Sequence, residues 1–172
     1  MEAAIKTARI ATGRDRILAF ENGYHGLAFG SLTATHYKAD SFRAPFEGQL
    51  GKHVDHACFD GALPDDLSGY AAVIVEPIQG RGGIRSPSPG WLRDLIRTAH
   101  QQDVLVIFDE IYTGFGRTGD WFAFQHQSLE GERPDLLCIG KAMAGGFPIS
   151  ACLGTATAVS YTHLTLPTIY SV

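Results

Sequence analysis

Two runs of consecutive apolar residues, 71–75 and 104–108, constrain the fold of this chain most strongly. They read Ala-Ala-Val-Ile-Val and Val-Leu-Val-Ile-Phe, and continuous rather than alternating apolarity is typical of strands buried on both faces of a parallel sheet. Between them, residues 90–102 have the period of an amphipathic helix, whose apolar face contains Leu92, Leu95, Ile96 and Ala99. Strand, helix and strand with short connections form a βαβ unit. The sequence therefore predicts an α/β fold, with a mostly parallel sheet and helices on both faces.

The remaining segments fit the same architecture. A helix is expected from the first residues to Gly13, and short strands are expected over 16–20, 136–139 and 149–153. Residues 27–66 show little periodicity, so we expect mostly loop with short helices there.

Composition narrows the possible partners. The 172 residues include 14 basic and 18 acidic side chains, a net charge of −4 without a basic block. Neither nucleic acid nor an anionic membrane surface is therefore expected as a partner. The apolar runs are far shorter than the ~20 residues that span a bilayer, and the first six residues lack the pattern of a signal peptide. Three cysteines without a CxxC pair fit a reducing cytosol, which predicts a cytoplasmic protein.

The last residues do not continue the preceding pattern. Residues 159–168 can be back-translated into a DNA string that resembles the transposon-end adapter of sequencing libraries. We therefore expect the native sequence to stop near Ala158 and residues 159–172 to be a non-native tail. A genuine β-rich tail is the alternative.

Candidate catalytic residues follow the buried strands. Asp109 and Glu110 stand at the carboxyl end of one strand, at the edge of an open α/β sheet where ligands bind. A carboxylate there can accept a charged hydrogen bond from a cationic ring nitrogen, although a helix cap or an ion pair with Arg117 is the plainer interpretation. Lys141 lies between another buried strand and a glycine-rich stretch. Partial burial there would lower the pKa of its amine and favour Schiff-base formation, whereas an exposed loop lysine is the alternative.

Three further motifs carry weaker signals. Residues 114–119 match GxGxxG, but a dinucleotide-binding motif follows its strand at once and opens a helix, and neither condition holds in this sequence. His53 and His56 are spaced like a metal-binding pair but lack a third ligand, so no metal site is predicted. Tyr24 and His25 place an aromatic ring beside an imidazole in a turn-rich segment.

Taken in chain order, these segments resemble the class III, pyridoxal-phosphate-dependent aminotransferases of fold type I. The resemblance covers essentially all of residues 2–158, and the lysine follows the aspartate at the family's spacing. It is carried by five motifs: Glu-Ala-Ala-Ile-Lys (2–6), Phe-Glu-Asn-Gly-Tyr-His-Gly (20–26), Val-Glu-Pro-Ile-Gln-Gly (75–80), Phe-Asp-Glu-Ile-Tyr-Thr-Gly-Phe-Gly-Arg-Thr-Gly (108–119) and Gly-Lys-Ala-Met-Ala-Gly-Gly (140–146).

The resemblance implies an activity and roles for individual residues. The activity is transfer of an amino group between an amine or ω-amino acid and a 2-oxo acid, with pyridoxal phosphate as cofactor. Lys141 would bind the cofactor covalently and carry a proton between it and the substrate, while Asp109 would keep its ring nitrogen protonated. Tyr24 would stack on the ring with His25 beside it, and Glu76 would lie close to the substrate. A related aminomutase or decarboxylase is the alternative, and an NAD-type nucleotide-binding domain is the rival from another class.

Two departures from the family pattern matter. Tyr112 stands where several members have a glutamine that reaches the cofactor's phenolic oxygen, so its hydroxyl is the candidate substitute. The family's phosphate-binding turn and small domain have no counterpart in this sequence. Residues 1–158 are therefore expected to be part of the cofactor-binding large domain and inactive alone, and the family implies a homodimer for the full-length protein.

Overall fold

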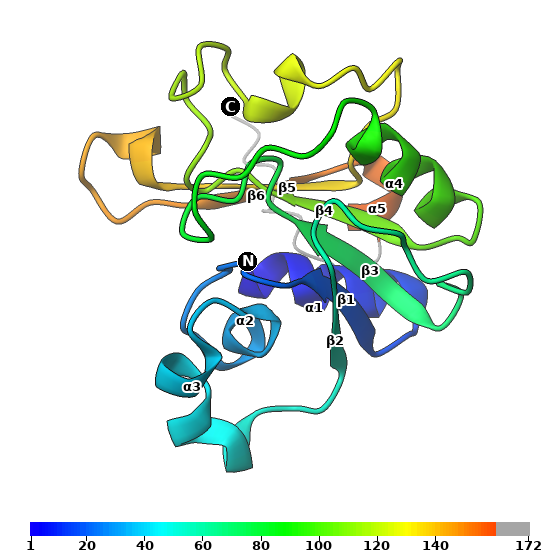
Figure 1. Ribbon diagram of the computed structural model, residues 1–172, viewed down its shortest axis with the longest axis vertical. Coiled ribbons are helices and arrows are strands. Elements are labelled where there is room, and N and C mark those ends of the chain that lie inside the picture. The colour runs from blue at the N-terminus through cyan, green and yellow to red at the C-terminus, as the bar shows by residue number, and fades with distance from the viewer. Residues whose placement is uncertain (161–172) are drawn as a thin grey trace, which may run out of the picture.

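A six-stranded sheet forms the centre of the molecule in the computed structural model, which describes residues 1–160 (Figure 1). The strands are arranged in the order β2-β1-β3-β4-β5-β6. Each pair of neighbours is parallel except β5 and β6, which are antiparallel. The predicted mostly parallel α/β fold is therefore confirmed. The strand bounds are β1 Arg16–Phe20, β2 Val54–Ala57, β3 Tyr70–Val75, β4 Leu105–Asp109, β5 Leu136–Ile139 and β6 Ala151–Gly154.

Two longer helices cover opposite faces of the sheet, α1 Glu2–Thr12 and α4 Trp91–His100 (Figure 1). Helix α1 ends as predicted at Gly13, whose left-handed backbone (φ 68°) lets its N–H donate to the Arg9 carbonyl. The shorter elements are the helices α2 Phe29–Ala34, α3 Ala39–Phe42 and α5 Ala156–Val159, and the 3₁₀ turns η1 Ala44–Gln49, η2 Ala123–His126 and η3 Lys141–Ala144.

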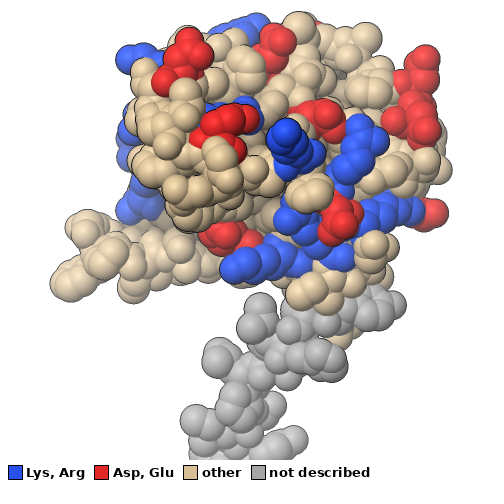
Figure 2. Space-filling view, turned by 90° about the horizontal axis from the view of Figure 1, so that it is seen from below, with Lys and Arg blue, Asp and Glu red and all other residues tan. Residues whose placement is uncertain are grey.

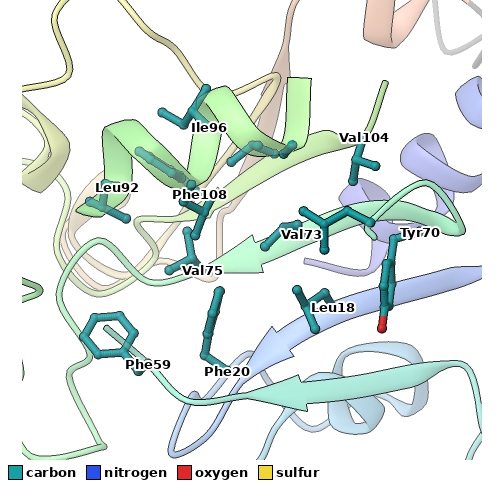
Figure 3. Close-up of a cluster of buried hydrophobic side chains, with 14 of the residues drawn as sticks. Leu18, Phe20, Phe59, Tyr70, Val73, Val75, Leu92, Ile96, Val104 and Phe108 are labelled. Atoms are coloured by element: carbon teal, nitrogen blue, oxygen red, sulfur yellow. The ribbon is translucent and has the colours of Figure 1, made fainter. Parts of the chain in front are cut away.

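The continuous apolar strands have a core on each side. In β3, Val73 and Val75 pack towards α4, whereas Ala72 and Ile74 pack towards α1. Figure 3 shows the first of these cores, in which side chains of α4 such as Leu92 meet side chains of β1, β3 and β4. Every residue of β3 is buried, and none of its side chains is charged.

Residues 27–66 contain short helical segments, as predicted, but they also contain the edge strand β2, which the sequence analysis does not predict. Its residues are exposed or half-buried, and its sequence, Val-Asp-His-Ala, lacks a buried apolar run because only β1 pairs with it. His56 in this strand approaches the Ala34 carbonyl at 3.2 Å, and burial lowers the pKa of its imidazole to about 4.

Charges of both signs lie side by side on the face of the molecule seen in Figure 2. None of the helices in residues 1–160 is long and apolar enough to cross a membrane. Of the segment expected to be a non-native tail, residues 161–172 lie outside the described part of the chain.

Candidate active site

The carboxyl ends of four parallel strands meet around one cavity. Chain segments that leave β1, β3, β4 and β5 enter it, and the carboxyl edge of such a sheet is where α/β proteins bind ligands. The cavity has a volume of about 580 Å³. Its lining contains all six residues that the sequence analysis predicts for the site: Tyr24, His25, Glu76, Asp109, Tyr112 and Lys141. A second cavity, of about 640 Å³, lies between the 124–135 segment and β6 and contains none of them.

Asp109 is held by a buried imidazole. His25 Nδ1 donates to Asp109 Oδ2 over 2.8 Å, and both side chains are almost fully buried. The other carboxylate oxygen accepts the Ile111 N–H at 3.1 Å. The alternative ion pair of Asp109 with Arg117 is not formed, because the Arg117 guanidinium lies over the Tyr112 ring instead. His25 Nε2 is buried and has no hydrogen-bond partner among the described residues, which is uncommon for a buried polar atom.

Glu76 joins two of the loops that line the cavity. Its Oε1 accepts the Tyr24 N–H at 2.9 Å, and its Oε2 accepts the Gly80 N–H at 3.0 Å. Burial raises the pKa of this carboxyl group above its usual value, although His25 and the two N–H donors oppose that shift. Glu76 therefore fixes the positions of Tyr24 and of the glycine-rich turn after β3.

Tyr24 lines the cavity, and its ring is next to a cation. The Arg81 guanidinium carbon lies 4.3 Å from the ring centroid, which is within cation–π range. The ring also meets the edges of Tyr37 and Phe42. Stacking of Tyr24 on a cofactor ring stays a prediction.

Lys141 differs from the sequence prediction in its burial. Its residue is exposed rather than partly buried, because the segment 141–150 that it opens is itself mostly exposed in the described structure. Its Nζ lies 5.2 Å from the centroid of the Tyr112 ring, facing the cavity. Lys141 also has a positive φ of 26°, a conformation that costs a non-glycine residue of order 1–3 kcal/mol and clusters at functional sites.

Glu110 has a structural role that sequence reasoning missed. Its carboxylate is fully buried and accepts hydrogen bonds from the Thr113 hydroxyl and from the N–H groups of Ala123 and Phe124. Burial raises the pKa of this carboxyl group. These hydrogen bonds connect Glu110 to both ends of the loop that contains the 114–119 motif. The sequence did carry a signal for this separate role. Glu110 directly follows Asp109, and neighbouring residues at a strand end point in opposite directions.

The GxGxxG motif forms a turn and opens no helix. Phe115, Gly116 and Gly119 have positive φ values, and residues 120–122 lead into the short turn η2. The NAD-type alternative is therefore wrong, because a dinucleotide motif needs the N-terminus of a helix for the phosphates. Within residues 1–160, no group of three or more His, Cys, Asp or Glu side chains is placed to hold a metal ion.

Comparison with known proteins assigns the family. The model of the family described as aminotransferase class-III matches residues 63–165. The chain belongs to the class III aminotransferases. It is 46% identical over 155 residues to an acetylornithine aminotransferase from Methanothermobacter thermautotrophicus, covering 88% of this chain and 38% of the relative. It is 37% identical over 169 residues to a diaminobutyrate–2-oxoglutarate transaminase from Wolinella succinogenes, covering 89% of this chain and again 38% of the relative.

Solved structures agree with this family. The ornithine aminotransferase of Toxoplasma gondii superposes with a TM-score of 0.80 at 28% identity, covering 99% of this chain and 42% of that protein. An S-selective transaminase from Bacillus megaterium gives a TM-score of 0.78 at 29% identity, covering 94% of this chain and 42% of that protein. This class III aminotransferase chain thus spans about 38% of the length of the curated relatives that it matches.

The residues around the cavity fit pyridoxal phosphate, the cofactor of class III aminotransferases. The cofactor's aldehyde requires a primary amine, its pyridine nitrogen a carboxylate, and its ring a flat side chain. Lys141, Asp109 and Tyr24 offer these three groups around one cavity, which His25 also lines.

Proposed function

We propose that the protein containing this chain transfers an amino group between an amine or ω-amino acid and a 2-oxo acid, using pyridoxal phosphate. The observation that carries this proposal is the meeting of Lys141, Asp109, Tyr24 and His25, from separate strand ends, around one cavity of about 580 Å³.

Each residue around the cavity would have its own role in this reaction. Bound pyridoxal phosphate supplies a carbon that accepts amino groups and a ring that withdraws electrons from the substrate. Lys141 brings a primary amine to the cavity and moves a proton at Nζ. Asp109 presents a negative charge to the ring nitrogen, and His25 keeps that carboxylate in one orientation through the 2.8 Å hydrogen bond. Tyr24 offers an aromatic face, and Tyr112 brings a hydroxyl to the same cavity.

The names of the relatives support aminotransfer over the aminomutase and decarboxylase alternatives, because they describe transaminases of acetylornithine and diaminobutyrate. Both substrates named there derive from diamino acids, so we propose a donor of this ω-amino type. The position of Glu76 beside the cavity supports its placement near the substrate, although both of its oxygens already bind backbone N–H groups.

We further propose that residues 1–158 are part of the cofactor-binding large domain of a cytoplasmic homodimer. The coverage of 38% of the relatives supports the first part of this proposal. Exposed apolar side chains in the segment that follows Lys141, among them Phe147 and Ile149, support a subunit interface at this segment. The three free thiols support a reducing compartment.

Covalent mapping of the cofactor tests the proposal. The full-length protein is loaded with pyridoxal phosphate, reduced with borohydride to make the bond to the lysine permanent, digested and analysed by mass spectrometry. We expect the pyridoxyl label on Lys141, because it is the lysine that lines the cavity.

Two variants make the mapping decisive. Lys141→Ala should lose both the label and turnover, whereas Lys52→Ala, at an exposed position away from the cavity, should keep both. A label on Lys6, Lys38 or Lys52 in the unmodified protein would refute the assignment.

A further inference from the structure

Two of the three cysteines face each other across the last pair of strands. Cys138 in β5 and Cys152 in β6 are directly opposite in the antiparallel register. Directly opposite residues of neighbouring strands extend their side chains from the same face of a sheet, so both thiols lie on one side. All three cysteines of the described structure have free thiols, and the third, Cys58, is exposed at the end of β2.

The hydrogen-bond pattern places this pair at the closer of the two antiparallel spacings. The Cys138 carbonyl accepts the Glu110 N–H at 2.9 Å, so the backbone polar groups of Cys138 point towards β4 and away from β6. Independently, the Thr155 N–H donates to the Asp135 carbonyl at 2.9 Å, which marks a bonded pair three positions away.

Because bonded and non-bonded pairs alternate along an antiparallel ladder, Cys138 and Cys152 form a non-bonded pair. In such pairs the Cα atoms are about 4.5 Å apart, within the 4.4–6.8 Å or so that disulfides bridge. The two strands therefore hold the cysteines within disulfide range without a rearrangement of the backbone.

The environment makes the two sulfurs chemically unequal. Cys138 is fully buried, whereas Cys152 is half-buried. A hydrogen bond between the thiols lowers the pKa of Cys152, and the same hydrogen bond, together with burial, raises the pKa of Cys138. The pKa of the exposed Cys58 thiol shifts in the opposite direction to that of Cys152, because a hydrogen bond to Glu21 raises it. Cys152 is therefore the more nucleophilic sulfur and Cys138 its neighbouring resolving thiol.

We propose that Cys138 and Cys152 are a redox-active pair that closes into a cross-strand disulfide on exposure to a hydroperoxide. The Cys152 thiolate attacks one peroxide oxygen, forming a sulfenic acid and releasing hydroxide or alkoxide. The Cys138 sulfur then displaces the sulfenic hydroxyl group, which leaves with the Cys138 proton as water. The two cysteines together lose two electrons, which the hydroperoxide gains, and a dithiol reductant reverses the reaction.

The pair lies next to the cavity in the sheet, because Asp109, on the strand beside Cys138, lines the cavity. Cys138 is the register partner of Asp109, and the closed ring would contain Lys141 and the glycine-rich turn that follows it. Cytosolic disulfides of this kind are typically transient and redox-sensing. The oxidation chemistry itself does not depend on the proposed aminotransfer.

Peptide mapping of a Cys58→Ser variant tests the proposal without altering the pair. Trypsin cleaves after Lys141 and, because Arg133 precedes a proline, separates residues 118–141 from residues 142–172. After brief treatment of the full chain with hydrogen peroxide under native conditions, we expect these two peptides to be joined. The intact protein should be lighter by two hydrogens, and a dithiol reductant should reverse both changes.

Comparison with denatured protein and single variants separates the outcomes. Cys152→Ala should leave Cys138 reduced under the same treatment, and Cys138→Ala should leave Cys152 as a sulfenic or sulfinic acid. If the native Cys58→Ser protein instead adds oxygen at Cys152 while Cys138 stays reduced, or if the linkage appears only after unfolding, the pair is not redox-active.

Discussion

The two hydrogen bonds of Glu76 give a quantitative prediction about the architecture of the site. Glu76→Ala removes the acceptor of the Tyr24 N–H and of the Gly80 N–H. A buried N–H group left without an acceptor costs about 1–3 kcal/mol, so the two together cost roughly 2–6 kcal/mol before other effects. The burial that raises the pKa of Glu76 offsets part of this. Water entering the cavity can also satisfy the freed N–H groups. We therefore expect a net destabilisation of about 2–4 kcal/mol.

The matched variant is Glu76→Gln. It keeps one oxygen acceptor but turns an amide N–H₂ group towards one of the two backbone donors. We therefore expect Glu76→Gln to destabilise the fold by roughly 1–2 kcal/mol, about half as much as Glu76→Ala. Urea unfolding followed by circular dichroism measures both values, with an unchanged slope showing that the same surface is exposed in each variant.

The pH dependence provides an independent check with a definite sign. The folded state raises the pKa of Glu76 above its usual value of 4.5, so the folded protein binds this proton more tightly than the unfolded chain. The corresponding stability is fully present below pH 4.5 and is lost as the pH rises through the folded pKa. The stability difference between wild type and Glu76→Ala should therefore shrink over that range. Equal stabilities of wild type and Glu76→Ala near neutral pH, or a difference that grows with pH, would refute the reasoning.

Two further substitutions have defined outcomes. Asp109→Ala should lower kcat of the full-length protein by roughly 10²–10⁴-fold while the borohydride label stays on Lys141, because the carboxylate acts on charge rather than on attachment; loss of the label would contradict this. Leu95→Ala removes a fully buried side chain between α4 and the sheet and should cost about 2–5 kcal/mol in urea unfolding. Leu27→Ala, at a half-exposed leucine, should stay within about 0.5 kcal/mol of wild type, and equal losses would argue against the described core.

The sheet could be predicted because its strands carry a local signal. Residues 71–75 and 104–108 are apolar at every position, and the structure buries them between two cores. The edge strand β2 escaped prediction for the opposite reason. It pairs on one side only, so Asp55 and His56 are tolerated there and no apolar run marks the strand.

The residues that line the cavity could be predicted from the ends of the strands, since the carboxyl ends of parallel strands share one edge of the sheet. The hydrogen bonds among these residues could not be predicted. Asp109 binds His25 across 84 positions of sequence, and Glu76 binds a backbone N–H 52 positions away. Such contacts depend on how β1, β3 and β4 are ordered, and the sequence predicts neighbouring strands without giving their order.

Lys141 shows where local reasoning about burial stops. A lysine that follows the apolar residues 136–139 suggests a buried amine, yet burial depends on what covers the strand end. In the described structure Lys141 opens a turn that leaves the sheet, and the segment after it is exposed up to β6. The amine is therefore placed at the cavity by a strained backbone (φ 26°) and by the neighbouring Tyr112 ring. The sequence predicts the residue and its strand end, whereas its environment is set by the turn and by a contact with Tyr112, which follows β4.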